Sequence, residues 1–392
     1  MTAVYLNALG LINPLGAGKA AVARALFAGD SSGMKPAAGF LTEQEVMVGK
    51  VTAPLPEIPK SLEKYDSRNN RMLLAALQEI EPDIRAAIET YGAKRVAVVL
   101  GTSTSGISDN EPGIAEKVKT GAFPDGFDYD RQDNASLALF ARSYFGLEGL
   151  AMSISTACTS SAKTLTSARR MIAAGLCDAA IVGGADTLCR LTLNGFGSLD
   201  LLSPTLCNPF SRNRNGINIG EGAAVFLMSR EKATVRVAGI GETSDAHHMS
   251  TPDPEGTGAF NAMRRALEAS GLAPEDIGYL NLHGTATELN DSMEAKAAFE
   301  LLGKVPCSST KPLTGHTLGA AGSTELAFLW LALKEESGAL PPHVWDGEAD
   351  PELPPVNLVA AGTCAPEARA MMTNSFAFGG NNISVILSRE ET

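Results

Sequence analysis

Residues 152–162 read Met152-Ser153-Ile154-Ser155-Thr156-Ala157-Cys158-Thr159-Ser160-Ser161-Ala162. The alternation up to Ser155 predicts a strand, and the small residues after Cys158 predict a helix that ends at Gly175. Free backbone N–H groups at a helix N-terminus stabilise a thiolate and lower the thiol pKa. A packed, inert thiol is the ordinary reading of a buried cysteine, but this strand–helix junction favours a nucleophile.

Strand-like and helix-like runs alternate along the rest of the chain, which predicts an α/β architecture with covered sheets. A strand that leads through a polar turn into a small-residue helix occurs in both halves. We therefore expect two pseudo-duplicated α/β halves, residues 1–230 with the cysteine and residues 231–392 with two histidines. Leu318–Lys334 reads as one long apolar helix.

The composition describes an ordinary globular enzyme-sized chain. With 392 residues, 44% hydrophobic and 19% charged, it can form one large or two fused domains. The net charge of −12 argues against a general nucleic-acid binder, although a local basic patch is compatible with it. The six cysteines lack metal-type pairing and read as free thiols of a reducing compartment, so we expect no metal site and a cytoplasmic location. We expect no signal peptide and no membrane span, because no apolar run is long enough.

Two histidines stand in Gly/Thr-rich turns, His283-Gly284-Thr285 and Gly315-His316-Thr317, and Lys311 lies five residues before the second. Taken singly, each has an ordinary interpretation: a loop histidine satisfied by backbone, a histidine near a helix start, and a solvated lysine. Together with Cys158 they are the reagents of acyl-transfer chemistry.

The motifs occur in a family-specific order, and the chain resembles the β-ketoacyl-[acyl-carrier-protein] synthases with a Cys-His-His centre over essentially its whole length. The matching segments are Ser155–Cys158, Pro209–Gly216, Asp245–Met249, His283–Thr287, Asn290–Glu294, Ser309–Lys311 with Gly315-His316, and Asn374–Gly380. The resemblance implies a thiolase-like fold in which the two halves form a layered α-β-α-β-α sandwich.

The resemblance also implies the reaction, a decarboxylative Claisen condensation of malonyl-carrier protein with an acyl group held on Cys158. His283 and His316 would donate hydrogen bonds to the thioester carbonyl and stabilise the enolate, which requires neutral rings. Lys311 and Glu294 would form a buried pair that orients and tunes the histidines.

Further roles follow from the same resemblance. The backbone N–H groups of Cys158 and Phe378 would form an oxyanion hole, and Phe378, with Phe376 in the same loop, would gate the acyl tunnel. Thr285 and Thr287 would contact the pantetheine arm. We expect no resident cofactor, because this phosphopantetheine arm arrives on the carrier protein.

Some positions depart from the family pattern, which favours a specialised synthase. Glu288 replaces a usual proline, Ala377 a glycine beside the gate, and Asn381 a threonine. Thr104 aligns with the acyl-pocket turn, where a hydroxyl hints at a polyene or polyketide type of substrate over a long saturated fatty acid. A turn threonine satisfied by its own backbone is the alternative.

Acyl carrier proteins are acidic, so a synthase needs basic residues near its tunnel mouth. We expect Lys60, Lys64, Arg68 and Arg71 to form the docking site for the acyl- and malonyl-carrier proteins, with a second group, Arg212 and Arg214, nearby. A solvated helix face is the alternative reading of the first cluster. The resemblance implies a dimer, either a homodimer or a heterodimer with a sister chain.

Two other functions remain as alternatives. A thiolase-type acyl-CoA enzyme needs a second cysteine near the C-terminus, but residues 374–380 contain none and Cys364 lies upstream. A non-catalytic chain-length partner of a heterodimeric synthase usually lacks the nucleophile, whereas Cys158 is present. A Cys-His-Asn centre is disfavoured because both histidines are present.

Overall fold

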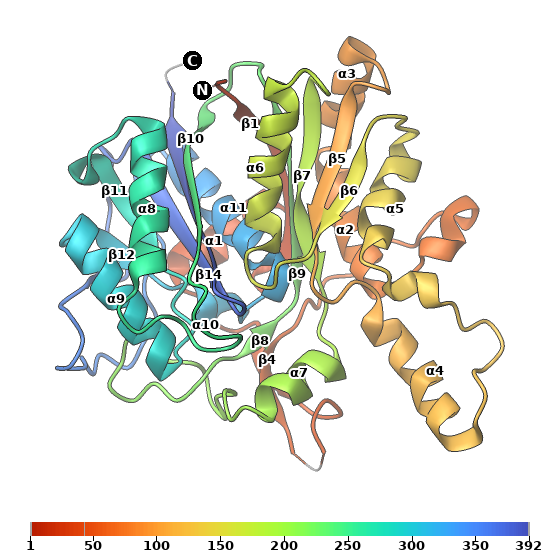
Figure 1. Cartoon of the computed structure of the whole chain (residues 1–392), viewed down its shortest axis with the longest axis horizontal. Helices are drawn as coiled ribbons and strands as arrows, with labels where there is room; N and C mark the ends of the chain where they lie inside the picture. The colour runs from red at the N-terminus through yellow and green to blue at the C-terminus, as the bar shows by residue number, and fades with distance from the viewer. Residues whose placement is uncertain (1, 43, 391–392) are drawn as a thin grey trace.

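The structure is a computed structural model that describes residues 2–42 and 44–390. Twelve strands form one sheet with an N-terminal and a C-terminal part, which meet where Tyr5 of β1 pairs with Arg236 of β10 (Figure 1). The N-terminal part contains, in sheet order, β6 (Ala151–Ile154), β5 (Val96–Gly101), β7 (Ala179–Asp186), β9 (Gly222–Ser229) and β1 (Tyr5–Asn13), with β2 (Gly16–Ala17) beside β1. The C-terminal part contains β10 (Val235–Ser244), β15 (Asn381–Arg389), β14 (Ala370–Ala377), β11 (Ile277–Asn281), β12 (Pro306–Ser308) and β13 (Asn357–Leu358).

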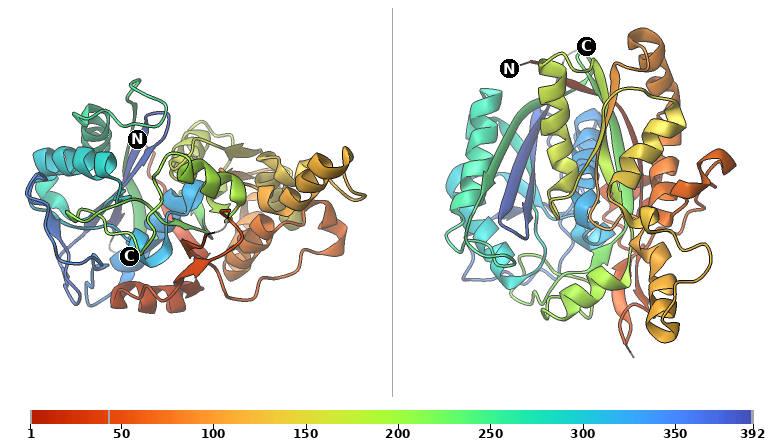
Figure 2. Two further views of the ribbon diagram at one scale, coloured as in Figure 1. Left: turned by 90° about the horizontal axis from the view of Figure 1, so that it is seen from below. Right: turned by 45° about the vertical axis from the view of Figure 1, so that its right-hand side comes forward.

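Helices cover both faces of each part. In the middle layer, α6 (Ser160–Ala173) and α11 (Ala321–Lys334) pack against each other and against the strands of the two parts. The outer layers contain α2 (Arg68–Glu79) and α5 (Ala135–Phe145) on one side, and α8 (Thr257–Ser270) and α9 (Glu288–Leu302) on the other. The expected α-β-α-β-α sandwich is therefore confirmed (Figure 2). Every residue of β5, β7 and β9 is buried, as strands covered on both faces require.

The remaining elements complete the fold. They are α1 (Lys19–Ala28), β3 (Met34–Ala37), β4 (Val46–Gly49), η1 (Lys60–Tyr65), α3 (Glu81–Tyr91), α4 (Ile107–Thr120), η2 (Tyr129–Gln132), α7 (Arg190–Gly197), β8 (Ile219–Gly220), η3 (Pro274–Asp276), α10 (Lys311–Thr314) and η4 (Leu318–Ala320). The strands β3, β4 and β8 form a separate small sheet. Among the described residues, no helix has the length and apolar character needed to cross a membrane.

The starts of the two central helices touch. A Cβ atom added at Gly322 would lie 2.7 Å from the Cβ of Ala162, so the contact requires glycine. The backbone N–H of Ser323 donates to the Ser161 hydroxyl over 2.8 Å. This contact brings together the two junctions at which the predicted cysteine and second histidine stand.

The predicted single helix from Leu318 to Lys334 is wrong at its start. Leu318 has a positive φ of 55°, which an α-helix does not allow, so residues 318–320 form the separate turn η4. The α-helix begins at Ala321 and is buried as far as Leu333. The break lets the chain turn sharply just after His316.

Candidate active site

Cys158 lies in a strained turn between β6 and α6. Ala157 has φ 52°, an uncommon conformation for a residue with a Cβ atom. The Ser160 hydroxyl donates to the Ala157 carbonyl over 2.6 Å and accepts the Thr156 N–H over 2.9 Å. The turn is thereby fixed, with the thiol buried just ahead of the first residue of α6.

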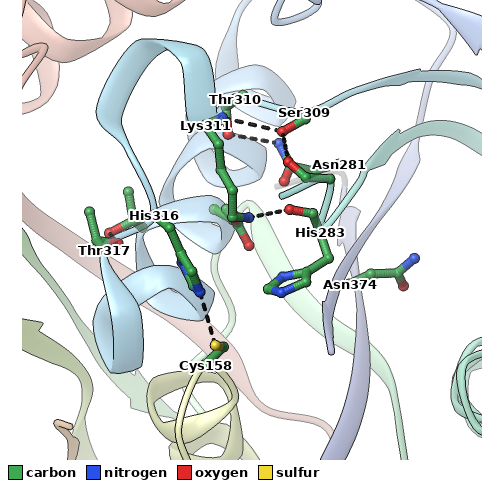
Figure 3. Close-up of polar contacts among 12 residues, drawn as sticks. Cys158, Asn281, His283, Ser309, Thr310, Lys311, His316, Thr317 and Asn374 are labelled. Atoms are coloured by element: carbon green, nitrogen blue, oxygen red, sulfur yellow. Dashed lines mark hydrogen bonds and ion pairs between the residues drawn. The ribbon is translucent and has the colours of Figure 1, made fainter. Parts of the chain in front are cut away.

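His316 reaches the thiol from the C-terminal half of the chain. Its backbone N–H donates to Asn218 and its carbonyl accepts from Gly220, over 2.8 and 2.9 Å, so the loop is bound to the β8 segment. Gly315, before it, has φ 69°, and a Cβ there would lie 2.7 Å from the Gly220 nitrogen. Nε2 of His316 lies 2.9 Å from Sγ of Cys158 (Figure 3).

His283 completes the group at the end of β11. Its ring stands nearly perpendicular to that of His316, at 87°, with 5.3 Å between ring centroids. The sulfur and one nitrogen of each ring all lie within 4.8 Å of one another. The structure therefore brings together the three reactive residues predicted from distant parts of the sequence.

Lys311 is buried beside the histidines, but the predicted pair with Glu294 is wrong. Its Nζ lies 2.7 Å from Oε1 of Glu325, a residue of α11, and it also donates to the His283 carbonyl (Figure 3). Both members of the pair are almost completely buried. An ammonium in this position needs a carboxylate, and the first turns of α11 supply it.

Glu294 instead holds the backbone of the His283 turn. Its two oxygens accept the N–H groups of His283 and Gly284, each over 2.8 Å, and Oε1 also accepts from Asn374 over 3.1 Å. Burial raises the pKa of Glu294 to about 7, against the effect of these donors. Glu294 thus fixes the position of His283 by binding its backbone N–H group.

Burial dominates the electrostatics of the site. It raises the pKa of Cys158 to about 12, although Lys311 and the backbone N–H groups of Cys158 and Phe378 act in the opposite direction. The lowered thiol pKa expected from the helix start is therefore not found. Burial, and secondarily the charge of Lys311, lower the pKa of His283 and His316 well below the usual range. Both rings are neutral at pH 7, as hydrogen-bond donation to a developing oxyanion requires.

A cavity of about 500 Å³ leads to the three residues. The ring of Phe378 lies at 5.5 Å from that of Phe196, centroid to centroid. The hydroxyls of Thr285 and Thr287 are 2.9 Å apart. The predicted residues that line the cavity are Cys158, His283, Thr285, Thr287, His316, Phe376 and Phe378, together with Arg214 of the second basic group.

Thiol and imidazole groups also bind zinc, so the three ligand atoms raise the question of a metal site. Two ligands of one tetrahedral zinc ion lie roughly 3.6 Å apart, whereas Sγ and Nε2 of His316 lie at the 2.9 Å of a hydrogen bond. The geometry is that of a proton-transfer pair. Cys364, the one cysteine near the C-terminus, is exposed and is not part of the cavity lining, so the second cysteine of a thiolase centre has no counterpart among the lining residues.

Thr104 does not face the cavity, and the predicted contact with an acyl chain is wrong. Its hydroxyl donates to Oδ1 of Asp186 over 2.8 Å and accepts the Thr187 N–H over 3.1 Å. The alternative, a threonine satisfied by backbone, is met only in part, because the hydroxyl accepts a backbone N–H but donates to the Asp186 side chain at the end of β7.

The predicted docking cluster is only partly available. Lys60 and Lys64 are exposed. Arg68 donates to both carboxylate oxygens of the buried Glu221, over 2.5 and 3.0 Å, and Arg71 forms two hydrogen bonds of 2.6 Å to Asp66. Both arginines are thus bound to carboxylates of this chain, and only the two lysines of this cluster remain free to contact a carrier protein.

The second basic group is likewise paired. Arg214 lies 2.5 Å from Asp350, with both side chains nearly buried, and Arg212 lies 3.8 Å from Glu348. These ion pairs hold the segment around Gly347 against the loop of residues 208–216. This structural role accounts for the two arginines without a partner protein.

Three buried titratable residues near the site were not predicted: Glu325, Asp186 and His343. Glu325 is the one charged residue of α11 before its last turn, and a lone carboxylate in an apolar helix demands a buried cation. Asp186 ends the apolar strand β7 in the same way. His343 accepts the Ser309 N–H at Nδ1 and contacts the Pro209 carbonyl with Nε2, both over 3.0 Å.

Comparisons with known proteins agree with this geometry. Residues 14–233 match the family description "Beta-ketoacyl synthase, N-terminal domain", and residues 234–344 match "Beta-ketoacyl synthase, C-terminal domain". A curated relative, 3-oxoacyl-[acyl-carrier-protein] synthase 2 of Coxiella burnetii, is 32% identical, with 98% of each chain covered. Its namesake in Vibrio cholerae is 30% identical, over 98% of this chain and 99% of the relative.

Solved structures that resemble this chain belong to ketosynthases and their partners as well. A ketosynthase (ApeO) in complex with its chain length factor (ApeC), from Xenorhabdus doucetiae, is matched at 44% identity with a TM-score of 0.95, over 99% of this chain and 98% of the other. The ishigamide ketosynthase/chain length factor is matched at 26% identity with a TM-score of 0.88, over the full length of both chains. The chain belongs to the beta-ketoacyl synthase family.

Proposed function

We propose that the protein is a 3-oxoacyl-[acyl-carrier-protein] synthase that joins an acyl group on Cys158 to a malonyl unit, with loss of carbon dioxide. The observation that carries this proposal is the buried group of one thiol and two neutral imidazoles, with Sγ of Cys158 2.9 Å from Nε2 of His316.

In the first half-reaction the acyl group moves from the carrier to the enzyme. The thiol gives its proton to His316, and the sulfur attacks the carbonyl carbon of the carrier thioester. The oxyanion of the tetrahedral intermediate accepts hydrogen bonds from the backbone N–H groups of Cys158 and Phe378, the same two groups that act to lower the pKa of the thiol. The carbon–sulfur bond to pantetheine then breaks, and the leaving thiolate takes the proton back from His316.

In the second half-reaction a carbanion forms from the malonyl thioester. His283 and His316, both neutral because of burial, donate hydrogen bonds to its carbonyl oxygen while the bond to the carboxylate breaks and carbon dioxide leaves. The carbanion attacks the acyl carbonyl on Cys158, a carbon–carbon bond forms, and the carbon–sulfur bond to Cys158 breaks. The sulfur leaves as a thiolate and takes up one proton from the solvent, which the overall reaction consumes. The product is a 3-oxoacyl thioester.

The cavity suits a pantetheine arm. Thr285 and Thr287 present hydroxyls along it, and Phe378 stands beside the thiol. This arm arrives with the carrier protein, so the proposed reaction needs no resident cofactor. The exposed side chains of Lys60 and Lys64 are the remaining candidates for contact with the acidic carrier.

We further propose a specialised polyene or polyketide type of pathway, in which the enzyme works as a dimer with a chain-length partner or a second copy. The 44% identity to a chain of the solved complex of a ketosynthase with its chain length factor supports this. Large apolar side chains exposed at the edge strand β6 and the adjacent α5, and on the segment from α4 to η2, also support a partner on this side of the chain. They are Ile114, Val118, Phe123, Tyr129, Leu139, Leu150 and Met152.

The absence of disulfide bonds among the six cysteines indicates the cellular compartment of the protein. All six are free thiols, which supports a reducing compartment such as the cytoplasm.

A reconstituted condensation tests the function. The chain, alone and co-purified with a sister ketosynthase-like chain, is mixed with acyl- and malonyl-carrier proteins, and 3-oxoacyl-carrier protein and carbon dioxide are measured. We expect both products with the native chain and no condensation with Cys158→Ala, while decarboxylation survives. Condensation by Cys158→Ala, or a preference for long saturated chains, would contradict the reaction or the pathway respectively.

A further inference from the structure

The carboxylate of Asp186 accepts hydrogen bonds from five donor groups. Its carboxylate is fully buried at the end of β7. It accepts the Thr102 hydroxyl over 2.7 Å, and the Ser103 N–H, the Thr104 N–H and the Thr104 hydroxyl, each over 2.8 Å. The Ala320 N–H approaches its second oxygen at 3.2 Å. Charge-assisted hydrogen bonds of this kind are about twice as strong as neutral ones.

These donors alone compensate the charge. Within residues 2–42 and 44–390, no lysine, arginine or histidine forms an ion pair with Asp186. A buried carboxylate without a cation is retained only where its hydrogen bonds are complete. The reaction as described above makes no use of it.

One of these donors follows the His316 loop, and the others lie in the 102–104 turn, beside the turn that carries Cys158. Ala320 belongs to η4, which follows His316 directly, and the Ser103 hydroxyl donates to the Ala157 carbonyl over 3.4 Å. A Cβ atom added at Gly319 would lie 2.7 Å from Oδ2 of Asp186, so η4 rests directly on the carboxylate. Asp186 therefore links η4, which follows His316, to the 102–104 turn, whose Ser103 contacts the turn that carries Cys158.

We propose that Asp186 is a positioning residue that sets the distance between Cys158 and His316. It holds η4 against the 102–104 turn, and thereby keeps Nε2 within hydrogen-bond distance of the sulfur. This inference rests on the proposed function for its importance, but its geometry concerns only the thiol and the imidazole.

The variant that tests the proposal is Asp186→Asn, which keeps the shape and turns one acceptor into a donor that faces N–H and O–H groups. The readout is the rate of Cys158 alkylation by iodoacetamide as a function of pH, followed by peptide mass spectrometry. A thiol paired with His316 reacts below its own pKa, whereas an unpaired buried thiol does not. We expect an alkylation rate at pH 7 reduced about tenfold or more, the equivalent of one charge-assisted hydrogen bond, and a profile shifted to higher pH.

Two further variants separate positioning from folding. Thr104→Val removes one donor to Asp186 without touching the charge, and should give a smaller shift in the same direction. Ile84→Ala, in the outer helix α3 and away from the site, serves as a control matched in stability loss and should leave the profile unchanged. If Asp186→Asn does not fold, the Thr104→Val profile decides.

A native profile in folded Asp186→Asn or in Thr104→Val would overturn the proposal, as would an equal shift in Ile84→Ala. The alkylation assay needs no carrier protein. A failed condensation by the native chain would therefore overturn the proposed function and leave this test readable.

Discussion

Sγ of Cys158 lies 2.9 Å from Nε2 of His316, although 158 residues separate them in the chain. The two side chains come from equivalent strand-to-helix junctions of the two halves, which meet because α6 and α11 touch at their starts. The contact makes His316 the base for a thiol that burial alone would keep protonated. The chemistry of the site therefore depends on how accurately the two halves are joined.

His316→Ala should slow alkylation of Cys158. The buried thiol has a raised pKa and needs an acceptor for its proton as it reacts. Without His316 we expect an alkylation rate at pH 8 that is lower by about tenfold or more. Iodoacetamide labelling with peptide mass spectrometry measures it. His248→Ala, at an exposed histidine, is the control. An unchanged rate in His316→Ala would show that the thiol is activated by another group.

Lys311→Met should destabilise the fold strongly. It leaves Glu325 charged and unpaired inside α11, which costs about 3 kcal/mol or more of unfolding free energy. The double variant Lys311→Met/Glu325→Leu removes both charges and should recover most of the loss. Urea unfolding measures all three chains. A double variant as unstable as the single one would mean that Glu325 is not the partner that matters.

His343→Gln should alter the pH dependence of stability. Burial lowers the pKa of His343 to about 4, whereas an unfolded histidine has a pKa of about 6.5. Only the unfolded chain therefore takes up the proton between these values, so the native stability is complete above pH 6.5 and is lost as the pH falls toward 4.

The stability difference between the native chain and His343→Gln isolates this effect, because the other groups cancel. Across that window it should fall by about 1.4 kcal/mol per pH unit. Urea unfolding at several pH values gives the slope. A difference that stays constant with pH would show that His343 is protonated in the folded protein.

Charge reversal should separate docking residues from structural ones. Lys64→Glu should raise the KM for carrier protein about fivefold at low salt and less at high salt, with kcat unchanged. Lys304→Glu, at another exposed lysine, provides the same change in net charge as a control. Arg68→Glu should instead lower the unfolding midpoint, because it places a second carboxylate against Glu221. Equal KM values for Lys64→Glu and Lys304→Glu at low salt would reject the docking site.

The reacting residues could be predicted from sequence because each stands in a short local signal. A thiol at the start of a small-residue helix and two histidines in glycine turns are visible without knowledge of the fold. The alternating pattern indicates an α/β architecture with covered sheets, whereas the layered sandwich is implied by the family resemblance. The order of the motifs then identified the family.

The partners of these residues could not be predicted, because they depend on which helix packs where. Lys311 pairs with Glu325, not Glu294, since the first turns of α11 lie under the lysine while Glu294 is taken up by backbone N–H groups. Thr104 likewise turns toward Asp186, which ends a different strand. The sequence also does not tell which residues of a basic cluster are free to bind a partner. Arg68 is an example, because it pairs with the buried Glu221.

The most direct test of the central claim is the mass of the enzyme after incubation with an acyl-carrier protein. The account predicts that the intact mass of the native chain rises by one acyl group, that peptide mapping places this group on Cys158, and that Cys158→Ala gains none. An acyl group on another residue, or an equal gain in Cys158→Ala, would contradict the account.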